Sequence, residues 1–123
     1  MFFLVHRFDS GIDFKRIEAI KRDQIIQRLS GEVELQRRRR PIGRHLLGND
    51  VVKAIEISHQ SLPGEDNIEE ELLFETLLRW CQNPAGTATG LELFEHLESA
   101  KCSPQILSLV KVLLGLSQIP VCY

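Results

Sequence analysis

Apolar residues in the last third of the chain recur at the spacing of amphipathic helices. Ser103-Pro104 precedes apolar residues at 106, 107, 110, 113 and 114, and Gly115 follows them. Serine as N-cap, proline at the first helical position and glycine after the last turn predict a helix over about 104–114. One segment earlier, Thr89 and Glu92 have the spacing of a capping box, which predicts a second helix that carries Leu93 and the apolar residues after it.

A third helix is predicted between Asn67 and the Asn83-Pro84 pair. Asn67 and the acidic residues after it are typical of a helix start, because negative charge is favoured in the first turn. The apolar positions of this helix include Leu73, Leu77, Trp80 and Cys81. Asn83-Pro84 ends it, since the residue before a proline avoids helical geometry.

The middle of the chain predicts two shorter helices. Pro41 can start one that carries Ile42, Leu46 and Leu47 and ends at Gly48. Asn49 or Asp50 then caps a helix with apolar residues at 51, 52 and 55, which stops before Pro63-Gly64. Helices that follow one another through such short loops favour a compact bundle.

The first third has a weaker pattern. Asp13 could cap a helix, but the apolar spacing changes near Asp23, which predicts a break there before the run ends at Ser30-Gly31. Residues 32–40 show no clear period, and no segment has a convincing strand signature. The sequence therefore predicts an all-α protein, an antiparallel bundle of about six helices over 13–116, with an N-terminal arm at 1–12 and a tail at 117–123.

Composition and net charge further restrict the class of protein. The chain has 123 residues, of which 43% are hydrophobic and 26% charged, the balance of one globular domain. A net charge of −2 gives no general preference for nucleic acid or acidic membranes. Three cysteines without a CxxC pair, and an apolar start of only five residues, favour a cytoplasmic protein, with the nucleus as the alternative, and no membrane insertion.

Signatures of catalysis and of cofactor binding are missing from the sequence. It contains no GxSxG, P-loop, GxGxxG or HExxH motif, and its four histidines are far apart. Cys81 is expected to be a buried thiol and His96 a partly exposed helix residue. We therefore expect no enzyme, no metal site and no cofactor.

A run of arginines is the most distinctive local feature, and a later stretch of acidic residues carries the opposite charge. The basic residues are Arg37, Arg38, Arg39, Arg40 and Arg44, and the acidic ones are Glu65, Asp66, Glu69, Glu70 and Glu71. The basic run can be a solvated helix end, a surface for an acidic protein partner, or a nucleic-acid or nuclear-import element. The acidic stretch can simply compensate a helix dipole, but two patches of opposite charge also permit head-to-tail self-association.

Several of these residues resemble a known family. Leu77-Leu78-Arg79-Trp80, a polar loop, and then Ala88-Thr89 followed by leucines at 93 and 97 resemble the fifth and sixth helices of death domains. Upstream, Ile42–Gly48 and then Val52 and Ile55-Glu56 resemble the second and third helices. The resemblance covers about residues 40–114, and it implies a death-fold Greek-key bundle with Trp80 at the centre of the core. Leu46, Ile55, Leu77, Phe94 and Leu97 would pack around it.

One position departs from the family pattern. Death domains usually carry a tryptophan where Arg39 stands, so either the second helix begins differently or Val33 or Leu35 fills the space. The death effector and caspase-recruitment domains are the alternatives within the superfamily, and the C-terminal motif favours the death domain.

The resemblance also implies a function. It implies a non-enzymatic adaptor or scaffold in apoptotic or innate-immune signalling, which binds other death-domain proteins or itself. Carried over to this chain, the arginines, Lys53 on the third helix and the acidic stretch are candidate partner-binding residues. The competing hypothesis from the residues alone is a nucleic-acid-associated helical domain that uses Arg37–Arg40, although the net charge argues against nucleic acid as a partner.

Overall fold

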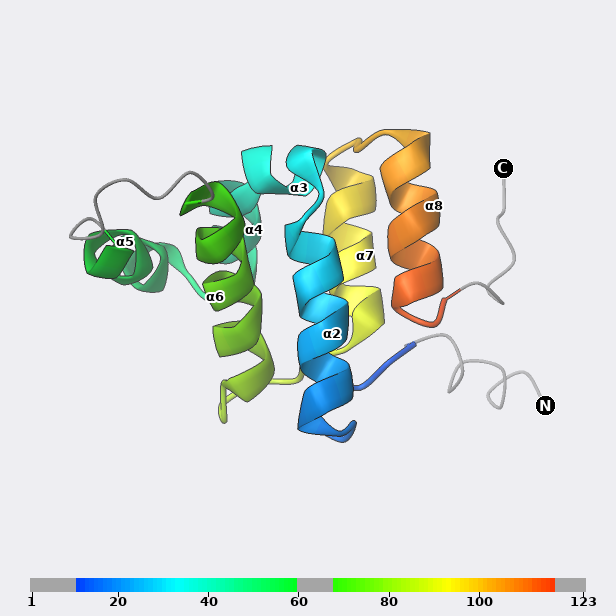
Figure 1. The fold of residues 1–123 in the computed structure, drawn as a ribbon, viewed down its shortest axis with the longest axis horizontal. Helices are drawn as coiled ribbons and strands as arrows, with labels where there is room; N and C mark the ends of the chain where they lie inside the picture. Colours follow the sequence, from blue (N-terminus) through cyan, green and yellow to red (C-terminus); the bar gives the residue numbers. More distant parts are fainter. Residues whose placement is uncertain (1–10, 60–67, 117–123) are drawn as a thin grey trace.

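The computed structural model describes residues 11–59 and 68–116, and these fold into helices joined by short connections (Figure 1). The predicted all-helical bundle is confirmed. The helices are α2 (Ala19–Ser30), α3 (Val33–Arg37), α4 (Arg39–Leu46), α5 (Asn49–His59), α6 (Ile68–Gln82), α7 (Gly90–Ser99) and α8 (Pro104–Leu113). None of these described helices has the length and apolar character needed to cross a membrane.

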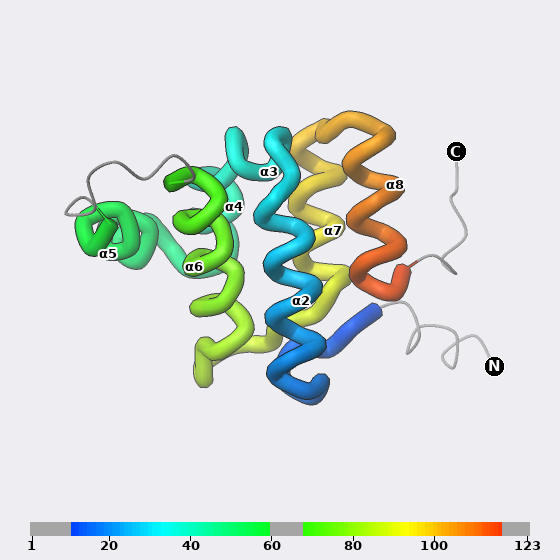
Figure 2. The backbone as a smooth tube through the Cα atoms, viewed as in Figure 1, coloured from blue at the N-terminus to red at the C-terminus, as the bar shows by residue number. Residues whose placement is uncertain are grey.

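Helix α6 is the hub of the bundle, because it packs against α2, α3, α4 and α5. Figure 2 shows the chain running up α2 and α7 and down α6 and α8, so α2 is antiparallel to α6, and α7 is antiparallel to α8. Helix α7 contacts α8 on one side and α4 on the other. Helix α5 is seen nearly end-on at the edge of Figure 1, so its axis crosses those of the longer helices.

The three helix predictions for the second half are confirmed where the structure describes them. Thr89 caps α7 by accepting a hydrogen bond from the backbone N–H of Glu92, and Ser103 caps α8 by accepting one from Ile106. Gly115 has a φ of +74°, a conformation in which only glycine is free of strain. Helix α6 ends at Gln82, just before Asn83-Pro84, as predicted, whereas Asn67 lies outside the described residues.

The prediction for residues 13–23 was wrong in two respects. Helix α2 begins at Ala19 rather than after Asp13, and it continues through Asp23 without a break. Asp13 instead pairs with Thr89 as an isolated bridge, and the N–H of Phe14 donates to the carbonyl of Ala88 at 2.8 Å. The carbonyl of Asp13 does accept from the N–H groups of Arg16 and Ile17, but this single turn stops before α2, and the residues around Asp13 are hydrogen-bonded to residues 88–90.

Two start sites in the middle were also misplaced. Helix α4 begins at Arg39, so Pro41 lies inside its first turn, where the missing N–H costs no helical hydrogen bond. Helix α5 already includes Asn49, and the carbonyl of Gly48 accepts from the N–H of Val52 at the junction.

The core is built around Trp80 of α6, which is only 3% exposed. Its ring meets that of Phe14 at a tilted angle, with 5.5 Å between the centroids. Most of the predicted core residues are buried, namely Leu77, Leu97 and Ile55, while Leu46 and Phe94 are only partly buried against the core. Burying an aromatic pair of this size is a large contribution to the stability of a small domain.

Candidate partner-binding surface

The predicted arginine run divides into three environments once the chain is folded. Arg39 points inward, and its side chain is only 10% exposed. Arg38 is half-buried, and its charge acts on Glu34 of α3 and His96 of α7. Arg37, Arg40 and Arg44 remain exposed.

Arg39 connects three helices through two carboxylates. Its Nε and Nη2 donate to the two oxygens of Glu69 on α6 at 2.7 and 3.1 Å, a bidentate pair. Its Nη1 donates to Oε2 of Glu56 on α5 at 2.9 Å. The hydrogen bonds from Arg39 lower the pKa of both carboxyl groups. Burial would lower the pKa of Arg39 itself, but the bonds to Glu69 and Glu56 outweigh that effect and raise it.

The ion-pair network lies at the position where the death-domain pattern has a tryptophan. Arg39 occupies it as a buried residue whose charge is compensated by two glutamates. Of the two residues expected to fill the space, Leu35 is in the core at 2% exposure, whereas Val33 is 56% exposed. A buried arginine needs such partners, because an unpaired charge away from water is very costly.

The exposed arginines surround a shallow polar hollow of about 480 Å³ on α3 and α4. Arg37, Arg40 and Arg44 line it together with Gln36, Arg39, Pro41 and Glu69. Arg40, which is 59% exposed, donates from Nε to Glu56 at 2.9 Å. Within the described ranges, Arg37 and Arg44 form no ion pair, so their guanidinium groups can reach an external acidic group.

The structure describes three of the five predicted acidic residues, and these lie in two environments. Glu69 belongs to the Arg39 network, and Glu70 and Glu71 are half-buried on α6. Glu65 and Asp66 lie outside the described residues, and Lys53 is exposed on α5. The structure thus brings part of the acidic stretch into contact with the arginine run, a pairing that neither stretch indicates on its own.

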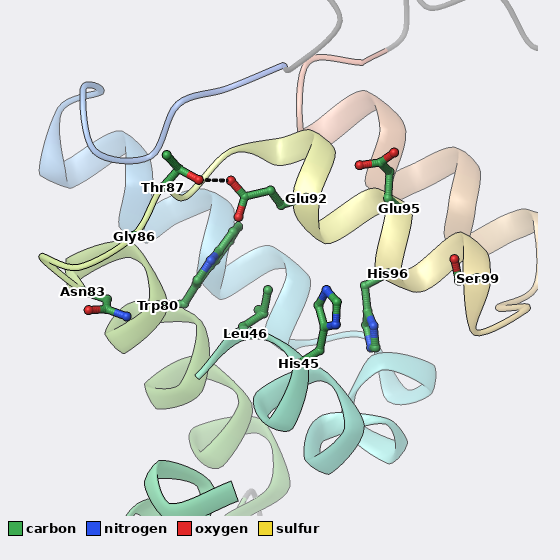
Figure 3. Close-up of a pocket in the computed structure, with 10 residues that line it drawn as sticks. All are labelled: His45, Leu46, Trp80, Asn83, Gly86, Thr87, Glu92, Glu95, His96 and Ser99. Carbon is green, nitrogen blue, oxygen red and sulfur yellow. Dashed lines mark hydrogen bonds between the residues drawn. The ribbon is translucent and has the colours of Figure 1, made fainter. Parts of the chain in front are cut away.

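A second hollow, of about 640 Å³, lies between α4, α7 and the α6–α7 connection (Figure 3). His45 of α4 and His96 of α7 line one side of it and stack on each other, with ring centroids 4.4 Å apart and planes 19° from parallel. Nε2 of His96 is buried without a hydrogen-bond partner. Burial, followed by the charges of His45 and Arg38, lowers the pKa of His96. The sequence did not predict this pair, since the two histidines are far apart along the chain and no spacing rule links them.

The second hollow also has an acidic rim. Glu92 and Glu95 of α7 line it, and the hydroxyl of Thr87 donates to the carboxylate of Glu92 (Figure 3). Elsewhere in the described part of the chain, Cys81 and Cys102 are buried free thiols. Burial raises the pKa of Cys81 to about 12, which disfavours the thiolate at neutral pH. No three or more His, Cys, Asp or Glu side chains within 11–59 and 68–116 are grouped so that they could hold a metal ion.

Comparison with known proteins adds no further constraint. No protein-family model, no curated protein and no solved structure matches this chain. The resemblance to death domains therefore rests on the residues quoted for it, and the arginine-lined hollow of α3 and α4 is the surface on which a functional hypothesis can be built.

Proposed function

We propose that the chain is a non-enzymatic adaptor or scaffold module, which associates with other death domains or with itself in apoptotic or innate-immune signalling. The resemblance of residues 40–114 to death domains suggests the class of partner. The cytoplasm is the compartment that this role requires. Acidic surfaces of such partners would bind the exposed arginines of α3 and α4.

The observation that carries the proposal is the outward position of Arg37, Arg40 and Arg44 around one hollow. Arg39, by contrast, is occupied within the fold. Exposed guanidinium groups that are not needed for folding can exchange water for a partner's carboxylates, and they steer association through their charge. Such contacts weaken as salt screens them.

The proposal is tested by reversing charges that the fold does not use. Arg37→Glu with Arg44→Glu changes the net charge by four units and leaves the Arg39 network in place. Analytical ultracentrifugation across a wide range of protein concentrations measures self-association, and a panel of purified, immobilised death domains measures hetero-association. We expect the wild type to associate more strongly at low salt, and the double variant to lose that association while its thermal midpoint is retained.

A matched control separates a specific surface from a general effect of charge. Arg16→Glu with Lys21→Glu makes the same change in net charge at exposed residues outside the α3–α4 surface. This control should associate like the wild type. A wild type that stays monomeric at every concentration and binds no member of the panel would contradict the proposal. Salt-sensitive binding to RNA or DNA that the Arg37/Arg44 reversal abolishes would instead support the nucleic-acid hypothesis.

A further inference from the structure

The arginine-lined hollow of α3 and α4 has a charge balance that suits one particular anion. Arg37, Arg39, Arg40 and Arg44 supply four positive charges, and the two paired glutamates, Glu56 and Glu69, supply two negative ones. Two positive charges are left without an ionic partner among the described residues. These belong to Arg37 and Arg44, the two exposed side chains that join no ion pair there.

Donor geometry points to the same kind of ligand. Arg40 uses only its Nε toward Glu56, so its terminal nitrogens stay available on a side chain that is 59% exposed. Arg40 and Arg44 are separated by one helical turn and therefore lie on the same side of α4. Planar guanidinium groups that converge on one hollow match the tetrahedral oxygens of a phosphate, each of which can accept several hydrogen bonds.

We propose that this hollow binds a phosphate monoester dianion, held by Arg37, Arg40 and Arg44. A phosphate monoester carries about −1.5 to −2 charges at pH 7 and offers three strong acceptor oxygens, whereas a carboxylate carries one charge and two oxygens. The dianion thus neutralises the two uncompensated arginines in one step. Arg39 stays with Glu56 and Glu69 and forms the fixed floor of the hollow.

This inference deepens the proposed function, since it names phosphorylation as the feature that the arginine surface recognises on a partner. Isothermal titration of the purified chain provides the test, at a protein concentration low enough to keep it monomeric. The probes are inorganic phosphate and three short blocked peptides of one sequence that carry phosphoserine, serine or glutamate at the central position.

We expect saturable one-to-one binding of the phosphoserine peptide, at least about tenfold tighter than the glutamate peptide and not detectable with serine. Arg37→Gln with Arg44→Gln should weaken phosphate binding by at least about tenfold. The control Arg16→Gln with Lys21→Gln should bind as the wild type does. Circular dichroism and thermal midpoints establish that both variants are folded.

The possible results separate this inference from the proposed function. Inorganic phosphate that binds as tightly as the phosphopeptide supports the same site with the free ion as its ligand. Three results would each overturn the inference. The wild type could show no saturable binding, the control variant could lose as much phosphate affinity as the Arg37/Arg44 variant, or the glutamate peptide could bind as tightly as the phosphoserine peptide. If phosphate fails to bind but the Arg37/Arg44 reversal still abolishes association, the proposed function stands without this refinement. Phosphate binding without any association would support the anion site and contradict the proposed function.

Discussion

Replacement of Arg39 by alanine tests whether the ion-pair network of α4, α5 and α6 stabilises the fold. The substitution removes the guanidinium group that joins Glu56 to Glu69. It also removes the aliphatic part of a buried side chain, so apolar contacts are lost together with the charge. Glu69 loses its ion pair, whereas Glu56 keeps its pair with Arg40.

The size of the effect follows from the exposure of the three side chains. Removing one member of a fully buried ion pair costs about 3–5 kcal/mol. Here Arg39 is 10% exposed, but Glu56 is 24% and Glu69 is 50% exposed, so water can hydrate part of the freed charge. We therefore expect a loss of about 2 kcal/mol in unfolding free energy. For a domain of this size that corresponds to a fall of about 8 °C in Tm.

Urea denaturation followed by circular dichroism at pH 7 measures this loss directly, with Arg40→Ala as the control. Arg40 pairs with the same Glu56 but is 59% exposed, so its removal should cost less than about 0.5 kcal/mol. Arg39→Met is a second comparison, which should cost less than Arg39→Ala because it keeps most of the apolar volume.

The pH dependence provides an independent check on the same network. Hydrogen bonds from Arg39 lower the pKa of Glu56 and Glu69 in the folded state. Their stabilising contribution is thus complete above the ordinary glutamate pKa of about 4.3 and is lost as the pH falls through the lowered values. The difference between wild type and Arg39→Ala should therefore shrink in acid. An Arg39→Ala variant within about 0.5 kcal/mol of wild type at pH 7 would refute the reasoning.

Three further predictions concern other parts of the bundle. Gly43→Ala should destabilise the fold by about 1–3 kcal/mol in urea denaturation, because the added Cβ atom would lie 2.6 Å from Cγ2 of Val52. Gly86→Ala is the control and should be nearly neutral, because the space around Gly86 is open. Burial lowers the pKa of His96, so its contribution to stability is present above about pH 6.5 and is lost as the pH falls further. The variant His96→Gln should therefore show a smaller decrease in the urea midpoint between pH 7 and pH 5 than the wild type does. An equal decrease in both proteins would contradict this prediction. Ser103→Ala removes the N-cap of α8 and should cost about 1 kcal/mol by thermal denaturation; a Tm equal to that of wild type would show that the cap is dispensable.

Local signals in the sequence were sufficient wherever one turn of chain decides the outcome. Thr89 and Ser103 cap α7 and α8 because their side chains reach backbone N–H groups only three residues away. Gly115 follows α8 with a positive φ, as a glycine after a helix predicts. Leu77 and Leu97 are buried, as the helical spacing of the leucines predicts. These effects depend on nearby residues, so the composition of a short window predicts them.

The sequence did not predict features that depend on distant residues. Residues 12–14 pair with residues 88–90, a single turn follows Asp13, and α2 begins only at Ala19. No window around Asp13 contains the information about that pairing. The same limit applies to the stacked histidines, which come from different helices.

The arginine run shows most clearly what each level determined. The sequence by itself established a helical chain with a dense basic stretch beside its second predicted helix. Only the tertiary structure decided that Arg39 is buried between Glu56 and Glu69, while Arg37, Arg40 and Arg44 stay exposed. The physical reason is that helix packing sets which side of α4 meets α5 and α6, and an arginine on that side must find carboxylates or remain in water.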